Sequence, residues 1–164
     1  METGAALNKH MLNIVLYQPE IPPNTGNIIR LCANTGCSLH LIEPLGFDLD
    51  NKKMRRAGLD YSEFAKISVY RNLNQFSADN DNPKFYAVTT KGSRAYDEVT
   101  YSEGDALVFG PETRGLPGEV LDRMEPARKI RIPMQRGSRS LNLSNATAIV
   151  VYEALRQLKF PDLV

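Results

Sequence analysis

The chain has 164 residues, of which 42% are hydrophobic and 24% are charged, and its formal net charge is +1. These values are typical of one globular domain and exclude a disordered chain, a collagen and a disulfide-dense secreted module. The longest apolar run, residues 148–152, is too short to span a bilayer, and no basic start precedes an apolar signal core. We therefore expect a cytoplasmic protein with no membrane segment.

Cysteine and histidine are both scarce. Cys32 and Cys37 are too few for a disulfide framework and have no partner ligands around them, so buried thiols are expected. His10 lies in residues 1–10, which show no hydrophobic period; we expect a disordered extension or tag remnant there and a single domain over residues 11–164. That domain contains one histidine, His40, which argues against a histidine-dependent hydrolase or a His-rich zinc site.

Charge is unevenly distributed along the chain. Eight acids and two arginines lie between Asp97 and Glu125, whereas residues 126–152 contain five basic residues and no acid. A second basic cluster occupies residues 52–56. Such local concentrations can bind a phosphate backbone even when the net charge is near zero. For the earlier cluster, a solvated surface remains an equal alternative.

Six short apolar runs predict β-strands, at residues 12–17, 39–42, 67–70, 85–89, 106–109 and 130–132. The first and fifth are largely continuous apolar blocks, as in strands buried on both faces of a parallel sheet. Helical segments alternate with them. Asn24 or Thr25 can cap a helix that Gly36 ends, and further helices are expected near residues 50–57, 117–124 and 142–158. The alternation predicts an α/β fold, with a mostly parallel sheet flanked by helices.

The last predicted helix is apolar on more than one side. Val151 and Tyr152 widen its stripe beyond the single face of an ordinary surface helix. In so small a chain the second surface is most simply covered by another copy, which predicts a homodimer. A central helix covered within one chain is the alternative.

Familiar nucleotide fingerprints are missing: there is no G-x-G-x-x-G after the first strand and no G-x-x-x-x-G-K-[ST]. Three other loops follow predicted strands, where ligands bind in open α/β sheets. They are PEIPPNTGNIIR at residues 19–30, FGPETRGLP at 109–117 and IPMQRGSRSLNLSNA at 132–146. Each loop alone is a weak signal.

Together the loops resemble motifs of the SPOUT superfamily of S-adenosylmethionine-dependent RNA methyltransferases, in the branch of tRNA ribose 2′-O-methyltransferases. Residues 24–30 are similar to its first motif, 109–117 to its second and 130–146 to its third, in the same order and spacing. The resemblance covers essentially residues 11–158. Within the branch, residues 12–36 are most similar to short enzymes that methylate the wobble ribose of certain leucine tRNAs.

This resemblance implies a fold and an activity. The α/β sheet should carry a C-terminal deep trefoil knot, which general topology rules would argue against, and the active unit should be a homodimer. The expected reaction transfers a methyl group from S-adenosylmethionine to the ribose 2′-hydroxyl of the tRNA wobble nucleotide, in the anticodon loop. Alternatives are a ribose methyltransferase acting on ribosomal RNA or another tRNA position, and a non-catalytic RNA-binding dimer.

The resemblance also implies the site residues. Cofactor contacts are expected at Val88, Gly110, Ile132, Met134, Ser140 and Leu141. The catalytic set is Arg30, Asn24, Glu112, Ser140 and Asn142. RNA contacts are expected from Arg136, Arg139 and Tyr152, although packing at an interface is an alternative for Tyr152. No metal is expected.

The role of Arg30 is left open. The family usually assigns the matching arginine as the base, but a guanidinium with a pKa above ~12 is a poor proton acceptor at neutral pH. In the second option Arg30 orients the hydroxyl and an RNA phosphate, and the proton leaves through phosphate or water. Alignment of the two reactants supplies much of the rate in either case.

Overall fold

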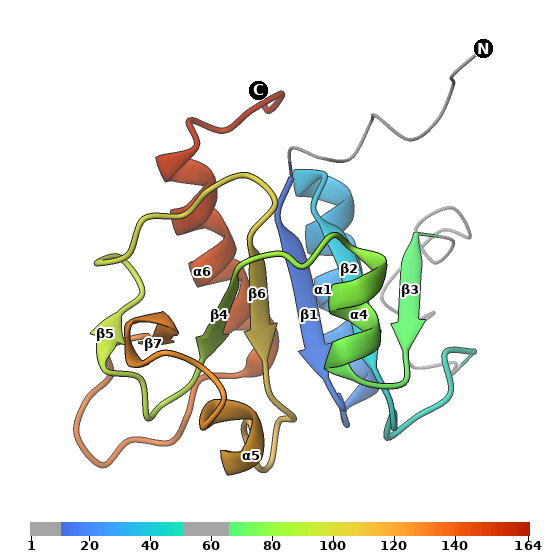
Figure 1. The fold of residues 1–164 in the computed structure, drawn as a ribbon, viewed down its shortest axis with the longest axis horizontal. Helices are drawn as coiled ribbons and strands as arrows, with labels where there is room; N and C mark the ends of the chain where they lie inside the picture. The colour runs from blue at the N-terminus through green and yellow to red at the C-terminus, as the bar shows by residue number, and fades with distance from the viewer. Residues whose placement is uncertain (1–10, 51–65) are drawn as a thin grey trace.

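The computed structural model describes residues 11–50 and 66–164, so residues 52–56 and nearly all of the helix expected at 50–57 lie outside the described residues. Within the described ranges, seven strands form one sheet in the order β3-β2-β1-β6-β4-β7-β5, and all neighbouring pairs are parallel (Figure 1). The strands are β1 (Asn13–Tyr17), β2 (Ser38–Ile42), β3 (Ile67–Tyr70), β4 (Phe85–Val88), β5 (Arg94–Ala95), β6 (Ala106–Phe109) and β7 (Lys129–Arg131).

Helices cover both faces of the sheet. They are α1 (Pro22–Thr35), α4 (Leu73–Asp79), α5 (Gly118–Leu121) and α6 (Leu143–Gln157), with a 3-10 turn, η1, at Pro126–Arg128. In Figure 1, α1 and α6 lie behind the sheet, whereas α4 and α5 lie in front of it. Two clusters of buried side chains match this arrangement: one joins β1 to α1 and α6, and the other joins the opposite face to Phe76 and Leu121. The predicted α/β class and mostly parallel sheet are therefore confirmed.

All six predicted strands are present, with ends shifted by no more than one residue. Besides the short η1 turn, two elements were not predicted. The strand β5 has only two residues, and it is paired with β7. Helix α4 has one fully buried side chain, Phe76, so it lacks a clear apolar period; its start is fixed by Asn72, whose side chain accepts the N–H of Gln75.

The predicted cap of α1 is wrong. The N-cap residue is Ile21, and Pro22 and Pro23 occupy the first turn, where a missing N–H costs nothing. Asn24 and Thr25 therefore lie inside the helix. The end is as predicted, because Gly36 adopts φ 76° and its N–H bonds to the carbonyl of Cys32. Burial raises the pKa of both thiols, Cys32 and Cys37, as expected of buried cysteines.

Strand β7 lies between β4 and β5, although those two strands are close in sequence. The turn that joins them rests on β7: the N–H of Thr89 bonds to the carbonyl oxygen of Ile130 at 2.9 Å, and that of Ser93 to Lys129 at 3.1 Å. A side chain at Gly92 would place its Cβ 2.7 Å from the Ile130 oxygen, so this close approach requires glycine. The trefoil knot itself stays a prediction.

Helix α6 follows the predicted range but divides its apolar residues differently. Val151 is fully buried within its own chain, so its assignment to an intermolecular surface is wrong. Ile149 and Tyr152, in contrast, are 36% and 46% exposed. They lie three residues apart, on one side of the helix.

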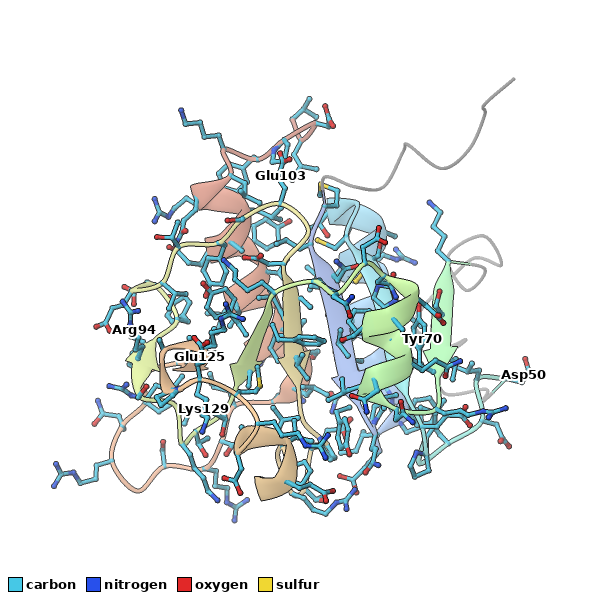
Figure 2. All side chains as sticks on the ribbon, in the orientation of Figure 1. Asp50, Tyr70, Arg94, Glu103, Glu125 and Lys129 are labelled. Atoms are coloured by element: carbon cyan, nitrogen blue, oxygen red, sulfur yellow. The ribbon has the colours of Figure 1, made fainter. Side chains whose placement is uncertain are left out.

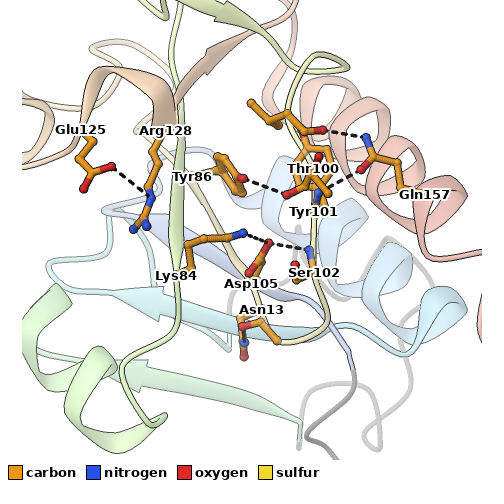
Figure 3. A network of polar contacts seen from close by, with 12 residues as sticks. Asn13, Lys84, Tyr86, Thr100, Tyr101, Ser102, Asp105, Glu125, Arg128 and Gln157 are labelled. Carbon is orange, nitrogen blue, oxygen red and sulfur yellow. Dashed lines mark hydrogen bonds and ion pairs between the residues drawn. The ribbon is translucent and has the colours of Figure 1, made fainter.

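A network of hydrogen bonds and an ion pair lies at the amino-terminal edge of the sheet (Figure 3). The buried carboxylate of Asp105 accepts the N–H of Ser102 at 2.8 Å and lies 3.3 Å from Lys84 Nζ. Gln157, at the end of α6, accepts the N–H of Tyr101 and donates to the carbonyl of Val99. These bonds join α6 to the segment that precedes β6.

A second internal network crosses the sheet at His40. Its Nε2 lies 2.9 Å from Asn13 Oδ1, and its Nδ1 lies 3.1 Å from the hydroxyl of Tyr70. Because Asn13 Nδ2 donates to the carbonyl of Gly104, Asn13 Oδ1 is an acceptor, which places the proton of His40 on Nε2. Burial lowers the pKa of His40 to about 4, so the ring is neutral in the fold.

Candidate functional site

A cavity of about 440 Å³ opens at the carboxyl ends of four adjacent strands. In Figure 1 these strand ends point toward the lower edge of the view. Its walls come from the start of α1, the β4–β5 turn, the loop after β6 and the segment between β7 and α6. Parallel strands bring their carboxyl ends to one edge of a sheet, which is why segments far apart in sequence meet here. The three loops singled out in the sequence therefore line one site.

Most of the predicted site residues lie in this lining. The expected cofactor set is present in full: Val88, Gly110, Ile132, Met134, Ser140 and Leu141. From the catalytic set, the cavity is lined by Asn24, Glu112, Ser140 and Asn142.

The other predicted residues lie outside the lining. Arg30 is exposed on α1, and Tyr152 is exposed on α6. Arg136 and Arg139 are exposed on the segment that leads into α6, between the lining residues Met134 and Ser140. Their roles stay predictions.

Glu112 connects two walls of the cavity. Its carboxylate accepts the N–H of Glu20 at 2.7 Å and the N–H of Ile21 at 3.0 Å, just ahead of α1. Each of its oxygens is thereby engaged with the backbone. A carboxylate at this position also favours the start of the helix electrostatically. Glu112 thus binds the two N–H groups that lead directly into α1.

Glu20 makes the reciprocal contact. Its carboxylate accepts the N–H of Thr113 at 3.0 Å and the hydroxyl of the same residue at 2.8 Å. These hydrogen bonds lower the pKa of Glu20, because they favour its charged form. Sequence analysis missed Glu20. The two glutamates together fix the loop after β6 against the start of α1.

Asn142 connects the other pair of walls. Its Oδ1 caps α6 by accepting the N–H of Ser144 at 2.9 Å, and its Nδ2 donates to Asn24 Oδ1 at 2.9 Å. Since the cap must use the oxygen of Asn142, its NH2 group faces Asn24, and Asn24 in turn must present its oxygen. The NH2 group of Asn24 is not used in this bond, so the side chain can offer it to a ligand as a donor.

Gly110 is required by the backbone of its own loop. A Cβ at Gly110 would lie 2.9 Å from Gly115 Cα and still closer to the N atom of Leu116. The glycine therefore permits the loop after β6 to fold back on itself, and substitution would disturb the loop before it could affect a ligand.

The lining also contains cations that sequence analysis missed. Lys91 lies in the β4–β5 turn, and Arg114 lies in the loop after β6. Lys91 belongs to no motif, although it follows a predicted strand end by two residues. Arg114 stands inside FGPETRGLP and could have been chosen on its position alone.

Two features are absent from the described part of the chain, a cluster of metal ligands and a membrane-spanning helix. No three His, Cys, Asp or Glu side chains in residues 11–50 and 66–164 are grouped so that they could hold a metal ion. Over the same ranges, no helix has the length and apolar character needed to cross a membrane.

Comparison with known proteins agrees with the fold. Residues 11–152 match the SpoU rRNA Methylase family. The tRNA (cytidine(34)-2'-O)-methyltransferase of Escherichia coli strain K12 is 58% identical over 154 residues, which cover 94% of this chain and 98% of that protein. The chain belongs to the SpoU methylase family, whose fold lies within the SPOUT class that the motifs resemble.

Two solved structures are also similar. One, a structure concerning the 2-OH methylation of C/U34 on tRNA, is 45% identical with a TM-score of 0.84, over 92% of this chain and 98% of that one. The other is an AdoMet-bound rRNA methyltransferase from Sinorhizobium meliloti. It is 28% identical with a TM-score of 0.79, over 92% of this chain and 58% of that one.

Proposed function

We propose that the chain is an S-adenosylmethionine-dependent methyltransferase that modifies the ribose 2′-hydroxyl of the tRNA wobble nucleotide, position 34 in the anticodon loop. The observation that carries the proposal is the meeting of the three loop motifs around one cavity, in a chain that matches a nucleotide-34 methyltransferase over almost its whole length. The AdoMet-bound relative supports the cofactor.

The cavity fits the cofactor chemically. Val88, Phe109, Leu116 and Ile132 offer an apolar wall for the adenine, and the adjoining loops offer backbone groups for the ribose. Ser140 and Leu141 would close over the methionine end. When bound, the cofactor supplies a methyl group on a positively charged sulfur.

The residues around the cavity divide into positioning and catalytic groups. Glu112 acts in positioning, because both of its oxygens accept backbone N–H groups and so hold the loop after β6 against the start of α1. Asn24 donates its NH2 group toward the substrate or cofactor, held in that orientation by Asn142. Neither side chain accepts the proton of the ribose hydroxyl.

Arg30 acts on the substrate from outside the cavity wall. It is exposed and absent from the lining, which favours an orienting role on RNA bound across the mouth over a role inside the pocket. The proton of the hydroxyl then leaves through phosphate or water. No metal takes part in this scheme.

The proposal includes a cytoplasmic homodimer with the family's knotted C-terminal segment. Ile149 and Tyr152 form an exposed apolar pair on α6, which a second copy would cover. Replacing both by lysine, with the buried Val151 left intact, should give folded monomers with weak activity. Light scattering measures the change; a wild-type monomer at micromolar concentration would reject the dimer.

Nucleoside analysis tests the function itself. Mass spectrometry of tRNA from a strain lacking the gene should show loss of one 2′-O-methyl nucleoside from position 34, restored by the wild-type gene. Loss of a methyl group from ribosomal RNA or another tRNA position would favour the first alternative. Unchanged RNA would favour a non-catalytic RNA-binding dimer, against which the placement of Ser140 and Asn142 in the cavity argues.

A further inference from the structure

Two cations line the mouth of the cavity, from the loops that follow the neighbouring strands β4 and β6. Lys91 is exposed on the β4–β5 turn, and Arg114 is exposed on the loop after β6. The one acid in the lining is Glu112, and its carboxylate is engaged with backbone N–H groups. With two cations against one acid, the described lining carries a net positive charge.

This charge does not match the cofactor. S-adenosylmethionine at neutral pH carries a positive sulfur, a positive amino group and one carboxylate, so it has one excess positive charge. Like charges close together in a pocket raise the free energy of binding. Two cations at the mouth are thus unfavourable for the cofactor, unless an anion is bound between them and it.

Lys91 is presented by a rigid turn. The N–H of Lys91 bonds to Thr89 Oγ1 at 3.2 Å, and the N–H of Gly92 bonds to the Thr89 carbonyl at 3.1 Å. The same turn is fixed on β7 through Thr89 and lies against Ile130 at Gly92. Because the backbone is already ordered, a phosphate bound by Lys91 would require only the side chain to be immobilised.

Arg114 is more strongly compensated. Its guanidinium donates to Gln18 Oε1 at 3.4 Å, a long hydrogen bond, and its charge contributes to lowering the pKa of Glu20. Among the described residues, the ammonium of Lys91 has no such hydrogen-bond partner. Lys91 should therefore contribute more to phosphate binding than Arg114.

We propose that Lys91 and Arg114 bind phosphates that flank the target nucleotide, and so hold the RNA backbone across the mouth of the cavity. The inference rests on the proposed function, because it assumes an RNA substrate. Lysine and arginine contacts to phosphate fix the register of a nucleic acid without specifying its sequence. The pair would place one ribose over the cofactor, whichever base that ribose carries.

Charge-removing variants test the proposal. Lys91→Gln should weaken binding of a synthetic leucine-tRNA anticodon stem-loop about tenfold, the scale of a lost charge-assisted hydrogen bond. The slope of log K against log salt should fall by about 0.7. Arg114→Gln should do the same to a smaller extent. Neither change should weaken S-adenosylmethionine binding, measured by calorimetry, by more than about twofold.

Arg94→Gln is the matched control. Arg94 lies three residues after Lys91, is exposed at the outer edge of the sheet (Figure 2) and donates to the carbonyl of Glu98. It does not line the cavity. The control should keep both the RNA affinity and the salt slope of the wild type.

Replacing single phosphates of the RNA by an uncharged analogue shows which phosphate Lys91 contacts. In stem-loops with an uncharged methylphosphonate on either side of nucleotide 34, the wild type should lose affinity at one linkage, and the Lys91→Gln variant should lose nothing further there. Fully additive losses at both linkages would overturn the proposal. So would an unchanged salt slope, or a tenfold loss of cofactor affinity, which would assign Lys91 to the cofactor carboxylate.

These binding measurements are independent of catalysis. If the wild type binds the stem-loop but transfers no methyl group to any RNA, the proposed function fails. The salt slopes of the variants then still decide whether Lys91 and Arg114 contact phosphate. If methylation proceeds and the slopes do not change, only the inference about Lys91 and Arg114 fails.

Discussion

The two ends of the sheet treat polar groups differently. At the amino-terminal edge, Asp105, Lys84 and Gln157 satisfy one another and the nearby backbone (Figure 3). At the carboxyl-terminal edge, the polar groups of Asn24 and Lys91 line an open cavity. The polar groups at the amino-terminal edge have protein partners, whereas those at the carboxyl-terminal edge include donors and cations that a ligand could engage. Substitutions at the two ends should accordingly separate stability from activity.

Arg30 should give the largest effect on activity. Arg30→Ala should leave folding and cofactor affinity nearly intact and lower methyl transfer by at least ~100-fold, the scale of a lost acid–base or orienting group. Arg30→Lys should rescue little, because a point charge does not reproduce the planar guanidinium. Single-turnover methylation of the stem-loop measures the rate, and wild-type activity of the alanine variant would remove Arg30 from the mechanism.

The pH dependence of these variants separates the two roles of Arg30. If it is the base, the lysine variant should gain rate steeply as the pH rises toward the lysine pKa, ~10. If it only orients, both variants should keep the wild-type pH profile at reduced height. The exposed position of Arg30 leads us to expect the second result.

The orientation of the Asn24 amide gives the next largest effect. Asn24→Asp keeps the acceptor for Asn142 but removes the donor, and should lower methyl transfer about tenfold or more. Asn142→Asp keeps the cap of α6 but removes the donor that orients Asn24, so it should lower activity while stability is retained. Thermal unfolding and methylation rates check both, and an unimpaired Asn24→Asp enzyme would refute the donor role.

Substitution of Asp105 should lower stability and leave the cofactor site intact. Asp105→Ala leaves the N–H of Ser102 and the ammonium of Lys84 without their acceptor, which should lower the free energy of unfolding by about 1–3 kcal/mol. Burial raises the pKa of Asp105 despite Lys84, so its charge is costly, and Asp105→Asn should lose less. Cofactor affinity, measured by calorimetry, should be unchanged in both. A loss of affinity without a loss of stability would contradict the separation of the two ends.

His40 should give a small, pH-dependent effect. Its folded pKa of about 4 is below its ordinary value of 6.5, so between these pH values the unfolded chain binds more protons. The free energy of unfolding should therefore fall with decreasing pH, by at most ~1.4 kcal/mol per unit from this residue. Urea unfolding of the wild type and of His40→Gln at pH 5 and pH 7 measures the difference; equal pH dependence would contradict the assignment.

Local sequence pattern predicted the strands well, because continuous apolar blocks such as β6 are buried on both faces whatever surrounds them. It failed where a residue far away in the sequence determines the local structure. The N–H of Ile21, the N-cap residue of α1, bonds to Glu112, which lies 91 residues further along the chain, so the sequence around the helix could not reveal this contact. Likewise, periodicity identified α6 but could not tell that Val151 faces the core while Tyr152 faces out.

The site was predicted through its motifs rather than through geometry. Residues inside the three loops, such as Ser140 and Ile132, do meet around the cavity. Glu20 and Lys91 were missed because each depends on a partner or a turn that forms only in the fold. No spacing rule relates Lys91 to the loop after β6, since their proximity follows from the strand order.

The most direct test of the account removes one oxygen atom, the 2′-hydroxyl oxygen of nucleotide 34. Purified protein with S-adenosylmethionine should methylate an anticodon stem-loop that carries ribose at nucleotide 34. It should bind the same stem-loop with 2′-deoxyribose at that nucleotide and transfer no methyl group to it. Methylation of the deoxy substrate at the rate of the ribose substrate would contradict the account.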